Sequence, residues 1–214
     1  MIAAFFDMDK TLLRVDTAMS WTRFLRARGE LSRTMLAKAV YWTGLYKLAL
    51  LDMDDVFARL AADLEGDAEA DMLAKCDEWY RDHVAPEIAP AARVAVEAHR
   101  RRGHTVVLAT GSTNYAAAPV ARDVGFDHVL SSVLEVRDGA FTGVAFPCFG
   151  THKVKLAEAW AASNGVDLAH SYFYSDSYND LPMLSRVGHA IAVNADARLE
   201  RHARRHGWPS LRWA

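Results

Sequence analysis

Cysteine is scarce in this sequence. The chain has 214 residues and two cysteines, Cys76 and Cys148, which form no CxxC pair and have no histidine-rich surroundings. We therefore expect neither a disulfide framework nor a zinc site. Reduced thiols are typical of the cytoplasm, where we expect the protein to be located.

Strong net charge and long apolar runs are also missing. The N-terminus, MIAAFFDMD, has no basic segment and no small-residue cleavage site, so we expect no signal peptide. The most apolar stretch, residues 35–51, is short for a membrane span and contains two lysines, which favours a buried helix over an integral membrane segment. The formal net charge of -2 gives no reason to expect nucleic acid as a partner.

Apolar runs alternate with segments of helical spacing along most of the chain. The runs that predict buried strands are residues 2–6, 105–109, 128–133, 171–174 and 190–193. Helical spacing occurs between them, at residues 90–102, 153–163 and 180–186. This alternation is typical of a parallel sheet covered by helices. We expect a doubly wound, Rossmann-like α/β core.

The pattern changes between residues 14 and 85, where apolar side chains recur at helical spacing and no strand-like run stands out. We expect an all-helical cap domain at 14–85, inserted into a catalytic core of residues 1–13 and 86–214. An insert after the first strand would cover the carboxyl edge of the sheet, where ligands bind in open α/β folds.

Two shorter segments add detail to this plan. The sequence Arg137-Asp138-Gly139 is typical of a hairpin turn and predicts a two-stranded flap. The basic segment 198–206 is interpreted as the solvated face of a helix.

Two pairs of acidic residues follow predicted strands. Asp7 and Asp9, in the segment DMDKT, come directly after the first strand, and Asp176 and Asp180, in DSYND, come after a later one. If these strands are neighbours in a parallel sheet, the carboxylates converge at its carboxyl edge. Crowded carboxylates repel one another, so a divalent cation is expected to hold them ionised, and hard oxygen ligands suit Mg²⁺.

Two elements suited to phosphate lie between the acidic pairs. The segment Thr110-Gly111-Ser112 follows a predicted strand and is expected to offer a hydroxyl and backbone N–H groups at the start of the next helix. Lys153 begins a later helical segment, where its ammonium would balance a phosphate and an aspartate. The nearby Lys155 is an alternative.

The order strand-DxDxT, strand-Thr-Gly, Lys, strand-DxxND resembles the haloacid dehalogenase superfamily of phosphotransferases. The helical insert and the DSYND segment are similar to the subgroup that includes phosphoserine phosphatase, subfamily IB, and the resemblance covers essentially the entire chain. It implies a Rossmann-like sheet with a mobile helical cap, a magnesium cofactor and a phosphatase reaction through an aspartyl-phosphate.

The resemblance also implies a role for each motif residue. Asp7 would attack phosphorus, and Asp9 would protonate the leaving group and then activate water. The phosphoryl oxygens would be held by Thr110, Gly111 and Lys153.

The same resemblance implies a metal site. Mg²⁺ would be bound by the carboxylates of Asp7 and Asp176 and by the backbone carbonyl of Asp9, with Asn179 and Asp180 supporting these ligands and the substrate. Ser175 departs from the family pattern, because a glycine often precedes the metal-binding aspartate there.

The sequence is least informative about the identity of the substrate. Asp16 falls where phosphoserine phosphatases carry an acidic residue that receives the substrate amine, and the alternative is that it caps a helix starting near Thr17. Candidate substrates are phosphoserine, histidinol phosphate and amino alcohol phosphates such as phosphoethanolamine, with a lipid phosphate as a further candidate. The alternative functions are a phosphotransferase or mutase of the same superfamily and a non-catalytic protein that binds a phosphorylated metabolite.

Overall fold

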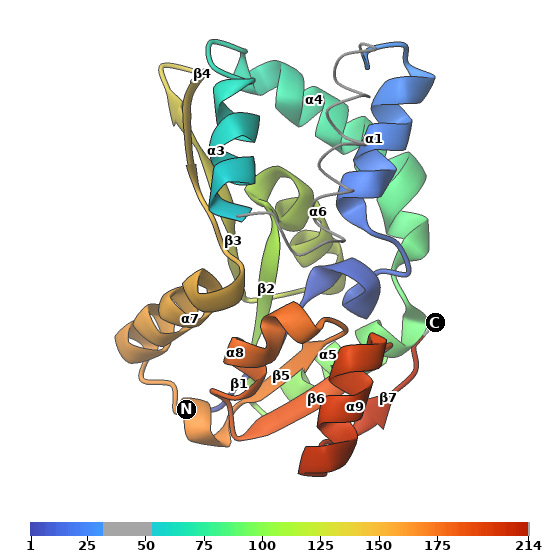
Figure 1. Ribbon diagram of the computed structural model, residues 1–214, viewed down its shortest axis with the longest axis vertical. Coiled ribbons are helices and arrows are strands. Elements are labelled where there is room, and N and C mark those ends of the chain that lie inside the picture. Colours follow the sequence, from blue (N-terminus) through green and yellow to red (C-terminus); the bar gives the residue numbers. More distant parts are fainter. Residues whose placement is uncertain (32–52, 214) are drawn as a thin grey trace.

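The computed structural model describes residues 1–31 and 53–213, and the helix predicted at 35–51 therefore lies outside the described residues (Figure 1). The described strands are β1 (Ala3–Phe6), β2 (Thr105–Thr113), β3 (His128–Arg137), β4 (Ala140–Phe146), β5 (Tyr172–Ser175), β6 (His189–Val193) and β7 (Ser210–Leu211). The α-helices are α1 (Thr17–Ala27), α3 (Met53–Ala62), α4 (Glu69–Trp79), α5 (Pro90–Arg101), α6 (Asn114–Val124), α7 (Gly150–Asn164), α8 (Leu181–Leu184) and α9 (Ala197–His206).

The strands form one sheet with the order β4-β3-β2-β1-β5-β6-β7. Every neighbouring pair is parallel except β3 and β4, which form an antiparallel hairpin. The first strand lies at the centre, between β2 and β5, and Phe6 of β1 is in register with Tyr174 of β5. The expected Rossmann-like α/β fold is confirmed, and the two acidic segments follow adjacent strands.

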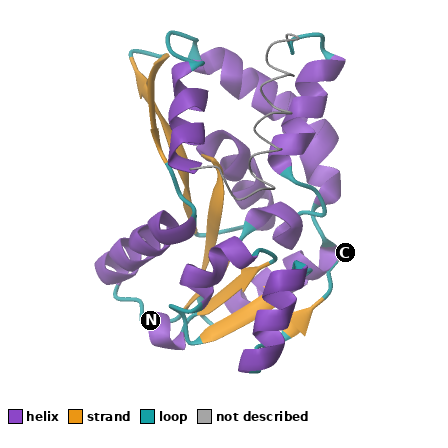
Figure 2. Ribbon diagram, in the orientation of Figure 1, coloured by secondary structure: helices purple, strands orange, loops and turns teal. Residues whose placement is uncertain are grey.

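The apolar run of β1 is buried on both faces because helices cover both sides of the sheet (Figure 2). Ala4 and Phe6 pack with the core residues of α5 and α6. Ala3 and Phe5 face the opposite way and pack with those of α7, α8 and α9. Side chains alternate between the two faces of a strand, so a strand buried on both faces reads as a continuous apolar run.

The predicted hairpin is confirmed as β3 and β4. Its turn residues, Asp138 and Gly139, both have positive φ angles, 52° and 78°, as a tight two-residue turn requires. The hairpin extends alongside α3 (Figure 1) and is hydrogen-bonded to the segment between α3 and α4. In these bonds Gly66 N donates to Phe141 O (2.9 Å) and Phe141 N donates to Asp67 O (3.0 Å).

The insert therefore contacts the hairpin formed by β3 and β4. Its described part contains α1, α3 and α4. The division into a core and a cap domain stays a prediction. No helix in the part of the chain that the structure describes is long and apolar enough to cross a membrane.

The boundaries differ from the sequence-based expectations in several places. Strand β3 was expected to end at residue 133 but extends to Arg137. Strand β2 was expected to end at residue 109 but extends to Thr113. The helix expected at 180–186 is a 3-10 turn, Tyr178–Asp180, followed by the single helical turn α8. The short edge strand β7 was not predicted. Two residues are too few to show a strand periodicity in the sequence.

Candidate active site

Asp7 stands at the carboxyl end of β1, and its backbone N–H donates to Tyr174 O of the neighbouring β5 (2.9 Å). A wide turn, Met8–Leu12, follows it, closed by a hydrogen bond from Leu13 N to Met8 O at 2.9 Å, and the backbone at Asp9 and Lys10 is not helical. Lys10 has a positive φ of 55° in this turn, and Asn194 Nδ2 donates to its carbonyl oxygen at 2.9 Å. Hydrogen bonds thus join the backbone of the DMDKT segment to β5 and to the loop that follows β6.

Lys153 joins the two acidic segments. Its Nζ donates to Asp7 Oδ1 at 2.9 Å and to Asp180 Oδ2 at 2.9 Å, and all three side chains are buried. Ser175 Oγ also donates to Asp180 Oδ2, at 2.7 Å. The serine that replaces the usual glycine therefore fixes the carboxylate that Lys153 binds. Lys155, the alternative, is exposed.

The charged groups around Asp7 shift its pKa in opposite directions. Burial raises the pKa of Asp7 well above its usual range, Lys153 opposes this shift, and the nearby Asp180, Asp176 and Asp9 add to it. Burial alone would lower the pKa of Lys153, but its attraction to Asp180 and Asp7 outweighs burial and raises it. Lys153 is therefore charged at neutral pH, and the surrounding negative charge exceeds what one ammonium balances.

Asp176 carries part of the excess negative charge. Thr11 Oγ1 donates to its Oδ1 at 3.4 Å. Burial and then the charge of Asp180 raise the pKa of Asp176 to about 7. A bound cation would relieve both effects, which is the physical reason that these residues fit a divalent metal.

The donor set suits Mg²⁺ with few protein ligands. Among residues 1–31 and 53–213, no three His, Cys, Asp or Glu side chains gather in the geometry of a metal centre. The expected set is smaller, with two carboxylates and the backbone carbonyl of Asp9. Mg²⁺ usually keeps several waters and takes one or two carboxylates plus substrate phosphate, so this set is sufficient.

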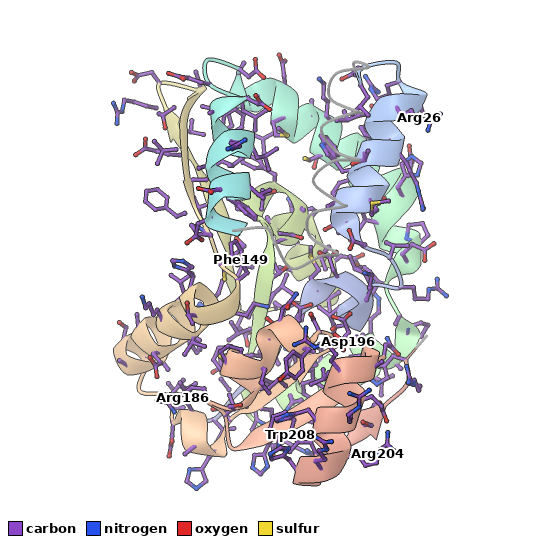
Figure 3. All side chains as sticks on the ribbon, in the orientation of Figure 1. Arg26, Phe149, Arg186, Asp196, Arg204 and Trp208 are labelled. Carbon is purple, nitrogen blue, oxygen red and sulfur yellow. The ribbon has the colours of Figure 1, made fainter. Side chains whose placement is uncertain are left out.

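The loop that carries Asp176 is fixed by Asp196, which Figure 3 labels beside α9. Asp196 N donates to Asp176 O (2.8 Å), and Asp196 Oδ2 accepts from Tyr178 N (2.8 Å). Its Oδ1 accepts from the first N–H groups of α9 and caps that helix. The loop is therefore fixed to the N-terminus of α9.

Asp9 is held by hydroxyl groups. Thr17 N donates to Asp9 Oδ1 at 2.7 Å, and Thr17 Oγ1 donates to Asp9 Oδ2 at 3.0 Å. Ser112 Oγ donates to the same Oδ2 at 2.8 Å. Burial raises the pKa of Asp9, while the hydrogen bonds from Thr17 and Ser112 oppose the shift. A carboxyl group in this environment is suited to carrying a proton.

The phosphate element differs from the expectation in one respect. Thr110 and Gly111 lie within β2, and α6 starts only at Asn114, so the segment does not form the start of the helix. The hydroxyl of Thr110 is buried and accepts from Ser112 N at 3.1 Å. Asn179 is exposed on the turn beside the buried Asp180. The binding roles of these residues stay predictions.

Asp16 caps α1, as one of the two interpretations expected. Its Oδ1 accepts from Met19 N at 3.1 Å, and its Oδ2 lies 3.3 Å from Lys10 Nζ. Both oxygens thus have partners, and a role in binding a substrate amine stays a prediction.

Sequence reasoning missed the part that Thr17, Ser112 and Thr11 have in this site. Each supplies a hydroxyl to a carboxylate that the motifs had already identified. Single serines and threonines carry no periodic signal in a sequence. The one available hint was that Thr17 begins a helix directly after the DMDKT turn.

Comparisons with known proteins identify the family of the chain. The family described as haloacid dehalogenase-like hydrolase matches residues 4–185. The phosphoserine phosphatase SerB1 of Mycobacterium tuberculosis is 36% identical over 212 residues, which cover 96% of this chain and 69% of that protein. The histidinol-phosphatase of Neisseria meningitidis is 30% identical over 216 residues, which cover 97% of each.

A solved structure shows the same fold. A protein with unknown function from Bordetella pertussis superimposes with a TM-score of 0.90 at 30% identity, covering 98% of this chain and 97% of that one. The extent of these matches confirms the expected resemblance and the expected enzyme class. The chain belongs to the haloacid dehalogenase-like hydrolase family.

Proposed function

We propose that this hydrolase removes phosphate from a small phosphomonoester through a covalent aspartyl-phosphate on Asp7, with Mg²⁺ as cofactor. The buried arrangement of Lys153 between Asp7 and Asp180, next to Asp176, is the observation that carries the proposal. It offers a nucleophile, a fixed positive charge and a position for a cation at one edge of the sheet. Phosphoryl transfer needs mainly such positioning and charge neutralisation.

The first step assigns one task to each side chain. The Asp7 carboxylate attacks phosphorus while Lys153 and Thr110 hold the phosphoryl oxygens. As the bond from phosphorus to the leaving oxygen breaks, Asp9 transfers its proton to that oxygen, and the alcohol leaves. Asp7 then carries the phosphoryl group as an acyl phosphate.

In the second step Asp9 acts as a base, whereas it acts as an acid in the first. The ionised Asp9 accepts a proton from a water molecule as the water oxygen attacks phosphorus. The bond between phosphorus and Asp7 breaks, which releases inorganic phosphate and restores the Asp7 carboxylate. Asp7, Asp176 and the backbone carbonyl of Asp9 would hold Mg²⁺. When bound, the cation supplies positive charge that reduces the repulsion between the Asp7 carboxylate and the phosphate of the substrate.

The relatives favour a phosphate ester that carries an amino group as the substrate. Phosphoserine and histidinol phosphate, named for the two relatives above, share an ammonium near the ester. We therefore favour an amino-bearing phosphomonoester as the substrate. A location in the cytoplasm also stays part of this proposal.

The test is release of inorganic phosphate from a panel of phosphorylated metabolites that includes these two compounds and phosphoethanolamine. Wild type is expected to need Mg²⁺, and Asp7→Asn is expected to reduce turnover by at least about 1,000-fold, because the nucleophile is lost. Asp82→Asn, which changes an exposed carboxylate, serves as the matched control and should retain activity. A folded, Mg²⁺-loaded wild type that releases no phosphate from any compound would contradict the proposal.

A further inference from the structure

We propose that Ser112 is a positioning residue that holds the carboxyl group of Asp9 toward the leaving group of the substrate. The inference rests on the proposed function, since it concerns the acid and base step assigned to Asp9. Its basis is a three-oxygen contact formed by Asp9, Ser112 and Thr17.

The contact is a closed triangle of oxygen atoms. Asp9 Oδ2 lies 2.8 Å from Ser112 Oγ and 3.0 Å from Thr17 Oγ1, and the two hydroxyl oxygens lie 2.8 Å from each other. Each separation is within hydrogen-bond distance. The second carboxyl oxygen, Oδ1, is fixed separately by Thr17 N. The carboxyl group is therefore held at both ends, which restricts rotation about its last single bond.

The three residues come from different parts of the chain. Ser112 lies near the end of β2, Thr17 is the first residue of α1, and Asp9 lies in the turn after β1. Through Ser112, a second strand of the sheet, β2, donates a hydrogen bond to Asp9. The backbone N–H of Ser112 is bound to Thr110 Oγ1, which fixes the strand end from which the hydroxyl projects. Asp9 is thereby oriented relative to the residue expected to bind phosphate.

Hydroxyl groups suit a residue that alternates between acid and base. A carboxylate only accepts hydrogen bonds, whereas a carboxylic acid also donates one. Ser112 can donate to ionised Asp9 and accept from protonated Asp9, so the contact survives both steps of the reaction. An alanine at this position can do neither and would leave Oδ2 with Thr17 alone.

The kinetic test compares substrates with two kinds of leaving group. A nitrophenolate leaves without much help from an acid, whereas an alkoxide, as from phosphoserine or histidinol phosphate, needs a proton. The value of kcat/KM reports the first step for both kinds of ester. Ser112→Ala is expected to lower kcat/KM for the alkyl phosphate about tenfold, the size of one lost hydrogen bond to a charged group. The loss for p-nitrophenyl phosphate should be less than about threefold.

Two controls accompany this variant. Ser112→Thr keeps the hydroxyl and should stay within about threefold of wild type on both substrates. Thr113→Val deletes the neighbouring hydroxyl and should show no preference between the leaving groups. An equal loss on both substrates with Ser112→Ala would assign Ser112 to phosphate binding or to structure, and an unchanged kcat/KM would also overturn the inference.

A crystal structure of Ser112→Ala gives a readout that does not depend on turnover. The Asp9 side chain is expected to adopt more than one orientation once the Ser112 hydroxyl is gone. A single, unchanged orientation overturns the positioning role even if the enzyme is active. Absence of phosphate release by wild type would instead contradict the proposed function, so the two failures can be told apart.

Discussion

Lys153 Nζ lies 2.9 Å from Asp7 Oδ1, and the Lys153 side chain is only 2% exposed. The same ammonium contacts Asp180, so one buried cation serves two buried carboxylates. Removing one partner of such a group leaves an uncompensated buried charge, which costs far more than a surface ion pair contributes. Lys153 is therefore expected to matter for folding as well as for turnover.

Lys153→Met is expected to lower the free energy of unfolding by about 3 kcal/mol or more, because Asp7 and Asp180 lose their buried counter-charge. Urea unfolding measures the loss. Phosphate release should fall to background in the fraction that remains folded.

The matched control is Lys155→Met, two residues along the same helix but exposed. It should change the free energy of unfolding by no more than about 0.5 kcal/mol. If the Lys155 variant were the more damaging one, the assignment of the phosphate-binding lysine to Lys153 would be wrong.

The stabilisation that Mg²⁺ produces should increase with pH. The pKa of Asp176 rises from 3.8 to about 7 in the folded, metal-free protein. The unfolded chain therefore loses this proton first, and the metal-free protein loses stability as the pH rises from about 4 to about 7. Mg²⁺ binds the ionised form, so the increase in Tm on adding Mg²⁺ should be small at pH 5 and reach several degrees at pH 8.

Thermal unfolding with and without Mg²⁺ measures this difference. Asp176→Asn should abolish most of the Mg²⁺ effect at pH 8, because a metal ligand is lost. An equal increase in Tm at pH 5 and pH 8 would argue against carboxylate ligands.

His99 should make the protein sensitive to acid in a different way. Its ring nitrogens contact Tyr174 OH (2.8 Å) and His104 Nδ1 (2.9 Å). Burial, followed by the charges of His104 and Arg102, lowers the pKa of His99 from 6.5 to about 4. Stability from the neutral ring is present above pH 6.5 and is lost as the pH falls toward 4, by up to about 3 kcal/mol.

His99→Gln keeps hydrogen-bonding groups but cannot titrate. The difference in unfolding free energy between wild type and this variant should therefore shift in favour of the variant as the pH falls from 6.5 to 4. A constant difference for His99→Gln across this range would contradict the buried, neutral ring.

Gly188 is expected to tolerate no side chain. A Cβ atom there would lie 1.8 Å from the backbone oxygen of Ala169, which cannot move as a flexible side chain could. Gly188→Ala should lower the free energy of unfolding by about 2 kcal/mol or more. Gly103→Ala meets nothing within 4 Å, and only its positive φ is strained, so it should cost about 1 kcal/mol. Equal losses in urea unfolding would refute the close contact.

The sequence predicts the central strands well because β1, β2, β5 and β6 are largely buried on both faces. A run such as residues 2–6 is apolar throughout for that reason, and its acidic end is conspicuous. The attachment of the hairpin to the segment between α3 and α4 could not be predicted. It depends on backbone hydrogen bonds around Phe141, and backbone groups are the same in every residue.

The same distinction applies to the candidate site. Asp7, Lys153 and Asp180 are found from their order along the chain, and the structure brings them together. The hydroxyl of Ser112 is not found in this way, because its partner Asp9 is distant in sequence and serine is common on any surface. Motif order reveals charged groups, whereas the neutral groups that orient them become visible only in three dimensions.

The insert leaves and rejoins the core at one narrow place. Leu13 and Ile88 form an antiparallel bridge there, and Ala89 N donates to Leu12 O at 2.9 Å. Since the chain comes back to the point from which it departed, the helices after the first turn of α1 can be lengthened, shortened or exchanged without moving Asp7, while Thr17 at the start of α1 stays to hold Asp9. Evolution can thus change what such an enzyme recognises while its chemistry is inherited intact.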